Sequence, residues 1–111
     1  MKIKTIDINA REWFDKINGN SYFSTVITLN FGMKSEKTVN IPFEYGYGDH
    51  YIDVANQLLI KEGYIQGKRN NNGSYTPLWQ YTRDNNIILR TNKKENCLKR
   101  ELLTNKLIVY T

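Results

Sequence analysis

The segment from Pro42 to Gly63 constrains the fold of this 111-residue chain more than any other part of the sequence. It joins a Gly-rich aromatic turn to an amphipathic helix. Gly46 and Gly48 allow backbone angles that other residues rarely adopt, so the turn can be sharp. Asp49 is a favourable N-cap and Gly63 a favourable C-cap, so the pattern predicts a helix over residues 49–62. The helical stripe that we expect to be buried consists of Tyr51, Ile52, Ala55, Leu58 and Leu59.

Two strands are predicted immediately before this helix. Residues 21–31 are dense in β-branched and aromatic side chains, and their apolar positions alternate. After a turn at Gly32 to Glu36, residues 37–43 place Val39, Ile41 and Phe43 on one face. The two runs together predict a long antiparallel hairpin.

The N-terminal region allows two interpretations. Residues 2–8 alternate well enough to predict a strand, which we place at a sheet edge. After Asn9, a possible N-cap, residues 10–17 fit a short helix whose apolar face is formed by Ala10, Trp13, Phe14 and Ile17, with Trp13 and Phe14 in the core. The alternative is a hairpin that turns at Asn18-Gly19, a dipeptide suited to a type I′ turn. The helical spacing favours the helix.

The C-terminal half predicts short strands separated by a polar loop at residues 66–74. The expected strands are residues 78–82, 87–91 and 107–110, whereas residues 92–103 fit either a helix or a strand and turn. No internal repeat or linker divides the chain. The sequence therefore predicts one α+β domain over residues 1–111, with an antiparallel sheet, one main helix at 49–62 and a short helix at 10–17.

Composition excludes several classes of protein. Apolar residues make up 40% and aromatic residues 13% of the chain, which is typical of a folded domain. No apolar run approaches the roughly 18 residues of a membrane span, and no signal-peptide core is present. The single Cys97 and single His50 exclude an internal disulfide and leave too few ligands for a zinc site. We expect a soluble cytoplasmic protein with no membrane partner, no metal and no cofactor.

The positive charge is concentrated in the second half. Residues 1–60 contain six Lys or Arg against seven Asp or Glu, whereas residues 61–111 contain ten against four. The basic half suits an acidic partner, although a solvated surface that maintains solubility would show the same bias. The candidate contacts for nucleic acid or an acidic protein surface are Lys68, Arg69, Arg83, Arg90, Lys93, Lys94, Lys99 and Arg100.

Aromatic residues are interleaved with these basic positions. Aromatic rings stack on unpaired bases while cations bind the phosphates. The candidate aromatic contacts are Tyr45, Tyr47, Tyr75 and Trp79, and many tyrosines are also typical of a protein interface. The alternation of Trp79 and Tyr81 on a predicted strand would instead place one or both in the core. The sequence contains no helix-turn-helix, RNP or zinc-finger motif.

The turn from Tyr45 to His50 supports a rival hypothesis, an enzyme or a binder of small ligands. His50 beside Asp49 and Asp53 has the composition of a general base held by a carboxylate, and the fold could bring Ser21 or Cys97 close to it. Helix capping explains the same residues. The turn matches no phosphate-binding motif, and Asp49 would repel a phosphate. We therefore assign no catalytic residue.

Two segments resemble known sequences. Residues 12–24 and 42–51 are similar to a group of small uncharacterised proteins of phages and bacterial mobile elements, over about half of the chain. The resemblance implies a virus-borne accessory protein acting in the host cytoplasm, of the kind that includes anti-CRISPR and other anti-defence inhibitors. Together with the charge, it predicts a non-enzymatic protein that binds nucleic acid or a host protein that handles nucleic acid.

Overall fold

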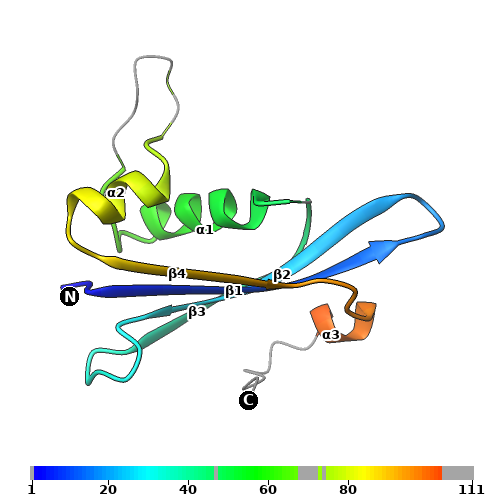
Figure 1. The fold of residues 1–111 in the computed structure, drawn as a ribbon, viewed down its shortest axis with the longest axis horizontal. Coiled ribbons are helices and arrows are strands. Elements are labelled where there is room, and N and C mark those ends of the chain that lie inside the picture. Colours follow the sequence, from blue (N-terminus) through cyan, green and yellow to red (C-terminus); the bar gives the residue numbers. More distant parts are fainter. Residues whose placement is uncertain (1, 47, 68–72, 74, 104–111) are drawn as a thin grey trace.

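Four strands and three helices make up the part of the chain that the computed structural model describes, residues 2–46, 48–67, 73 and 75–103. In chain order they are β1 (Thr5–Asp15), β2 (Asn20–Leu29), β3 (Lys37–Tyr45), α1 (His50–Lys61), α2 (Leu78–Asp84), β4 (Ile88–Lys94) and α3 (Lys99–Leu103) (Figure 1). The predicted α+β class is confirmed. The predicted strand at 107–110 lies outside the described residues.

The sheet is mixed and not wholly antiparallel. Its strand order is β3-β2-β1-β4, in which β1 and β3 are antiparallel to β2 whereas β4 is parallel to β1. From β3 at one edge, the chain crosses one face of the sheet through α1 and α2 and returns as β4 at the opposite edge (Figure 1). A parallel pair needs such a crossover connection.

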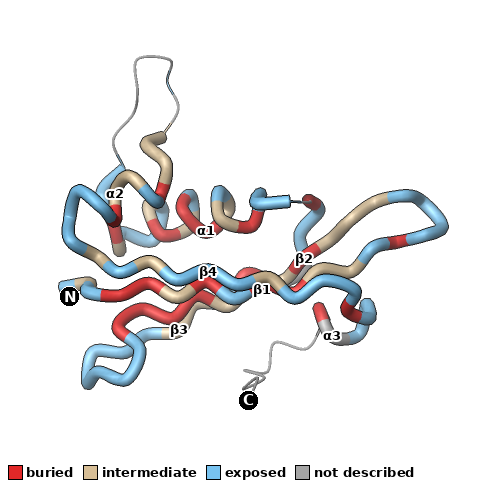
Figure 2. Tube along the Cα trace, in the orientation of Figure 1, coloured by how far each residue is buried: buried red, intermediate tan, exposed pale blue. Residues whose placement is uncertain are grey.

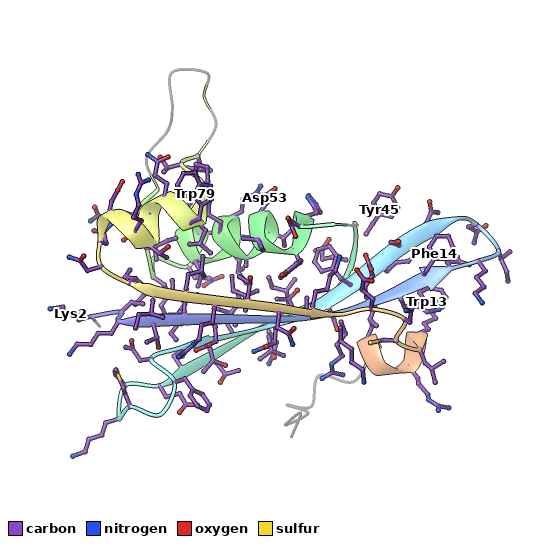
Figure 3. The ribbon with its side chains drawn as sticks, in the orientation of Figure 1. Lys2, Trp13, Phe14, Tyr45, Asp53 and Trp79 are labelled. Atoms are coloured by element: carbon purple, nitrogen blue, oxygen red, sulfur yellow. The ribbon has the colours of Figure 1, made fainter. Side chains whose placement is uncertain are left out.

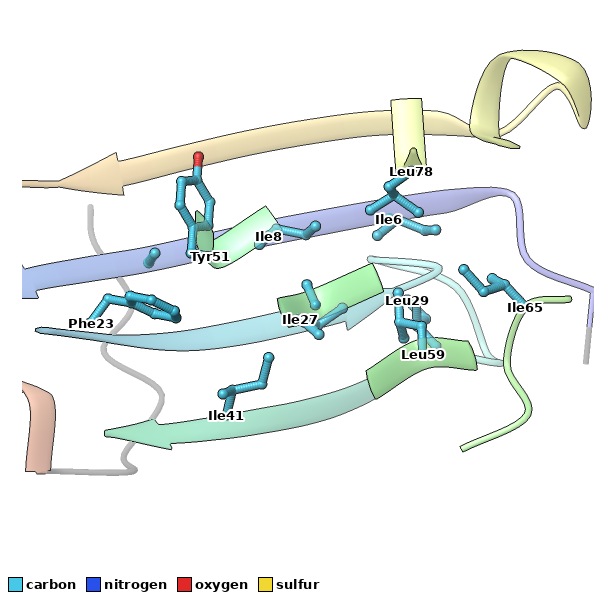
Figure 4. Packing of buried hydrophobic residues seen from close by; sticks show 12 residues of the cluster. Ile6, Ile8, Phe23, Ile27, Leu29, Ile41, Tyr51, Leu59, Ile65 and Leu78 are labelled. Atoms are coloured by element: carbon cyan, nitrogen blue, oxygen red, sulfur yellow. The ribbon is translucent and has the colours of Figure 1, made fainter. Parts of the chain in front are cut away.

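The hydrophobic core lies between α1 and the sheet. Figure 2 shows buried residues on the inner strands and on the underside of α1. Tyr51, Ala55 and Leu59 of α1 are buried, with Ile52 and Leu58 packed beside them, as predicted. The sheet contributes Ile6, Ile8, Ala10, Phe23, Ile27, Leu29 and Ile41 (Figure 4). Because each buried Ile or Leu contributes about 1.5–3 kcal/mol, this layer accounts for most of the stabilisation.

The predicted helix at residues 10–17 is wrong. The residues continue β1 to Asp15 and then turn at 16–19, so the alternative of a hairpin is confirmed. The turn has four residues and is not the predicted type I′ turn at Asn18-Gly19, because of these two residues only Gly19 has a positive φ. As part of β1, residues 10–15 form backbone hydrogen bonds with β2. A helix of only two turns would be marginally stable on its own. Ile17, predicted to face the core, is 93% exposed, and Phe14 is 48% exposed.

Other segments also differ from the prediction. Residues 2–8 do not form an edge strand, because β1 lies between β2 and β4. Residues 78–82 belong to the helix α2 and not to a strand. Leu78 and Thr82, four residues apart, are both buried, and this is helical spacing. In the ambiguous region 92–103, β4 continues to Lys94 and α3 begins at Lys99.

Asn30 connects the N-terminal segment to the turn after β2. It is fully buried and has a positive φ of 55°. Its Oδ1 accepts hydrogen bonds from the backbone N–H groups of Lys4 and Thr5, and its Nδ2 donates to the Lys2 carbonyl and to Ser35 Oγ. All the hydrogen-bonding capacity of the amide is thereby used, so this side chain fixes the start of β1.

We expect Asn30→Ala to destabilise the protein more than Asn86→Ala. Asn86 has the same φ of 55° but is exposed, so its replacement removes only the preference of Asn for left-handed backbone, about 1–2 kcal/mol. Asn30→Ala also leaves buried backbone groups unpaired, which costs about 1–3 kcal/mol more. Urea unfolding of both variants measures the difference. Equal losses of stability would show that the buried hydrogen bonds contribute nothing net.

Asp15 organises the turn between β1 and β2. Its Oδ1 accepts hydrogen bonds from the backbone N–H groups of Ile17 (3.0 Å) and Asn18 (3.3 Å), and its Oδ2 accepts one from Asn18 Nδ2 (2.7 Å). The side-chain bond from Asn18 is the largest cause that lowers the pKa of Asp15 from its ordinary value of 3.8, with smaller contributions from the two backbone bonds and the charge of Lys99. Burial opposes the shift.

The lowered pKa predicts a pH-dependent contribution of this turn to stability. Because the folded state favours the ionised Asp15, its stabilisation is complete above the unfolded-state pKa and is lost as the pH falls through the lowered value. The stability difference between wild type and Asp15→Ala should therefore be largest at about pH 7 and shrink towards about pH 2. Denaturant unfolding across this range tests it, with the exposed Asp84→Ala as control. A difference that does not change with pH contradicts the assignment.

Candidate nucleic-acid interface

Three aromatic rings form a continuous row across three neighbouring strands. Trp13 of β1 stacks on Tyr22 of β2, with ring centres 5.6 Å apart and an interplanar angle of 23°. Tyr22 meets Tyr45 of β3 edge-on, with ring centres 5.7 Å apart and an angle of 74°. Trp13 and Tyr22 are half-buried, and Tyr45 is 56% exposed. At the two ends of the row, Trp13 lies beside α3 and Tyr45 lies on the side of α1 (Figure 3).

Strand register creates this row. Trp13 lies opposite Tyr22 in the β1–β2 ladder, and Tyr22 lies opposite Tyr45 in the β2–β3 ladder. The second pairing depends on an irregularity between Phe23 and Thr25 that shifts the register by one residue. With the register that pairs Thr25 with Ile41, Tyr22 would instead face Glu44. The bulge therefore replaces a carboxylate beside the row with an aromatic ring.

The short helix α3 adds a cation to the row. The backbone N–H of Cys97 donates a hydrogen bond of 2.9 Å to the Glu12 carbonyl, and Leu102 is 1% exposed, so both ends of this segment are anchored. The anchoring places Lys99 Nζ 5.5 Å from the ring centre of Trp13. This distance is within the range of a cation–π interaction. Arg100, the next residue of α3, is exposed.

Two predicted basic residues of β4 lie on the same face as Trp13. Arg90 donates two hydrogen bonds to Asp7, of 2.6 and 3.0 Å. The hydrogen bonding to Asp7, together with the charge of that carboxylate, raises the pKa of Arg90. Most of its charge is therefore already matched. Lys94, opposite Arg11 in the ladder, is exposed and points to the same side by the alternation of β4. Both residues therefore present cations on the Trp13 face of β4.

Lys93 points to the opposite face and has a structural role. Its Nζ donates a 3.0 Å hydrogen bond to the Gly48 carbonyl and lies 3.6 Å from carboxylate oxygens of both Glu12 and Glu95. Its side chain is 15% exposed. Lys93 thus ties β4 to the loop that precedes α1, and the structure does not place it with the other predicted basic contacts.

The remaining predicted contacts lie elsewhere. Trp79, 57% exposed on α2, has the Arg83 guanidinium 5.2 Å from its ring centre, and Arg83 Nε lies 3.2 Å from Asp84 Oδ1. Figure 3 shows Trp79 at the other end of the molecule from Trp13. Tyr75 is half-buried before α2. Lys68, Arg69 and Tyr47 lie outside the described residues.

In the Tyr45–His50 turn, Gly46 is buried, whereas Tyr45, Gly48, Asp49 and His50 are exposed. The His50 ring meets Phe23 edge-on, with centres 6.0 Å apart. A Cβ atom at Gly46 would lie 2.6 Å from His50 Cδ2 and 2.7 Å from Phe23 Cε1, so only glycine fits. Asp49 begins α1 as predicted, but its side chain forms no capping hydrogen bond. The Sγ of Cys97 donates to the Lys94 carbonyl at 3.4 Å. The contacts of Gly46 and His50 with Phe23 give the Gly-rich turn a structural role.

A shallow hollow of about 230 Å³ lies away from that turn. Its lining residues are Lys2, Ile3, Tyr64, Tyr81, Asn85 and Ile87. Within the described ranges, no three His, Cys, Asp or Glu side chains are grouped to hold a metal ion. No helix in the same ranges is long and apolar enough to cross a membrane.

Sequence reasoning missed Trp13 and Tyr22 as candidate contacts. The predicted helix at residues 10–17 places Trp13 in the core, but that helix does not form. The alternative two-residue turn at Asn18-Gly19 would pair residues 17 and 20 and so place Trp13 opposite Ser24. Only the observed turn of residues 16–19 places Trp13 opposite Tyr22. The contribution of Lys99 depends on the docking of α3, for which the sequence carries no local signal.

The chain was also compared with known proteins. No family model, no curated protein and no solved structure matches it.

Proposed function

We propose that this protein binds single-stranded nucleic acid along the aromatic row of Trp13, Tyr22 and Tyr45. The observation that carries the proposal is the continuity of the three rings across three strands, with Lys99 over one end. Unpaired bases expose their faces to such rings, whereas the bases of a duplex are already stacked on one another. The row therefore favours a single strand.

Charge around the row supports this function. Lys94 of β4 and Lys99 and Arg100 of α3 are exposed, and Lys99 lies over the Trp13 end of the row. Phosphates would bind at that end and a base would stack on the exposed ring of Tyr45. An acidic protein surface could contact the same cations and rings, because aromatic residues are also enriched at protein interfaces. We favour nucleic acid because a row of rings beside cations matches the alternation of bases and phosphates along a single strand.

The proposed activity is binding without catalysis. The proposal assigns no role to His50, the candidate base of the rival hypothesis, whose exposed ring contacts Phe23. The role of an anti-defence inhibitor, which the resemblance to phage proteins implies, stays a prediction.

We expect Tyr45→Ala to weaken the binding of a labelled single strand of about 15 nucleotides by fivefold or more, because one stacked base is worth about 1–3 kcal/mol. Lys94→Ala and Lys99→Ala should each reduce the slope of log affinity against log salt by about one. Fluorescence anisotropy with DNA and RNA strands between about 50 and 200 mM salt measures both effects.

Two matched variants control this experiment. Lys34→Ala removes an exposed cation from the turn between β2 and β3, and Trp79→Ala removes an exposed ring from α2. Both should bind like the wild type, apart from a small uniform loss from the reduced charge of Lys34→Ala. If the wild type binds no strand at about 50 mM salt, or if Trp79→Ala weakens binding while Tyr45→Ala does not, the proposal is wrong.

A further inference from the structure

A second row of side chains crosses the sheet on the same face as Trp13. Asn9 lies opposite Asn92 in the β1–β4 ladder and opposite Val26 in the β1–β2 ladder, and Val26 lies opposite Asn40 of β3. Asn9 precedes Trp13 by four residues of β1, and residues an even number apart along a strand share a face. We call Asn9, Asn40 and Asn92 the asparagine row.

The asparagine row lies on the face of the sheet that α1 does not cover. Its three residues are exposed, and their side-chain amides form no hydrogen bond with another described residue. Each amide therefore offers a donor and an acceptor to a ligand. At about 3.3 Å per residue, Asn9 lies roughly 13 Å from Trp13 along β1, so the two rows belong to one continuous surface.

Folding does not explain asparagine at these positions. Asn is depleted in β-strands, where Thr or Val fits the pleated backbone better. The next row on the same face has Thr28 opposite Thr38, so β-branched residues do fit this surface. Residues that break a local preference without a compensating contact are expected at functional sites. Three asparagines from three strands in one row therefore indicate a ligand that binds amides.

Cations flank the asparagine row on β4. Arg90 and Lys94 lie two residues to either side of Asn92, about 6.6 Å along the strand, and both are exposed. Arg90 also pairs with Asp7. Lys94 is the cation nearer to the aromatic row. A strand that leaves Trp13 along β4 would meet a cation, an amide pair and a second cation, and this order matches alternating phosphates and bases.

We infer that Asn9 and Asn92 read an adenine base in the strand that leaves the aromatic row, so that the protein prefers adenine-rich single strands. This inference rests on the proposed function and deepens it, because the aromatic row would hold the neighbouring bases. A side-chain amide presents one donor beside one acceptor. Adenine presents its N6 amino group between two ring acceptors, N1 and N7, so an amide can form two hydrogen bonds with either edge of this base.

The test compares labelled adenine, cytosine and thymine DNA runs of about 15 nucleotides in the anisotropy assay at about 50 mM salt. Wild-type protein should bind the adenine run about fivefold or more tightly than the thymine run. The double variant Asn9→Thr with Asn92→Thr should lower this ratio about fivefold and leave thymine-run affinity within about twofold of wild type. Because threonine favours strands, the variant should keep the fold, which thermal unfolding checks.

A control and two sets of outcomes separate the proposals. Gln57→Ala removes an exposed amide from α1, on the other side of the sheet, and should leave the ratio unchanged. If the wild type binds all runs equally, the adenine inference is overturned while single-strand binding stands. The same holds if the double variant keeps the wild-type ratio, since stacking alone would then cause the preference, or if it weakens every run equally. If the wild type binds none of the runs, the proposed function fails instead.

Discussion

The whole structure depends on the pairing of β1 as one uninterrupted strand. It hydrogen-bonds to β2 from Ile6 to Asp15 and to β4 from Thr5 to Arg11. One half of the strand supplies Ile6, Ile8 and Ala10 to the core under α1. The other half stays paired with β2 and presents Trp13 on the opposite face. A single strand thus both closes the hydrophobic layer and supports the candidate interface.

The candidate interface is assembled from distant parts of the sequence. Trp13, Tyr22 and Tyr45 come from three strands, and Lys99 comes from a helix of five residues near the end of the described chain. Each ring depends on register, since a shift of one residue moves a side chain to the other face. The bulge between Phe23 and Thr25 places Tyr45, and not Glu44, beside Tyr22.

The Gly-rich turn before α1 has a different function from the one its composition suggests. Gly46 allows the rings of His50 and Phe23 to approach, and Lys93 reaches from β4 to the Gly48 carbonyl. These contacts attach the loop before α1 to β2 and to β4, and so hold the crossover connection between the two sheet edges in place. Glycine and a partly buried cation thus have a structural role in this turn.

The sequence by itself determined the elements whose patterns are local: the hairpin of β2 and β3, the helix α1 with its buried stripe, and the concentration of positive charge in the second half. Periodicity of apolar residues specifies such elements because each buries one face. Only the tertiary structure decided that residues 10–15 extend a strand, that residues 78–84 form a helix and that β4 lies parallel to β1. Residues 10–15 and 78–84 are short segments that fit both a helical and a strand periodicity, and pairing or packing with distant residues stabilised one of the two. The direction of β4 depends on the crossover through α1 and α2. The same long-range contacts joined Lys99 to Trp13, which no local pattern encodes.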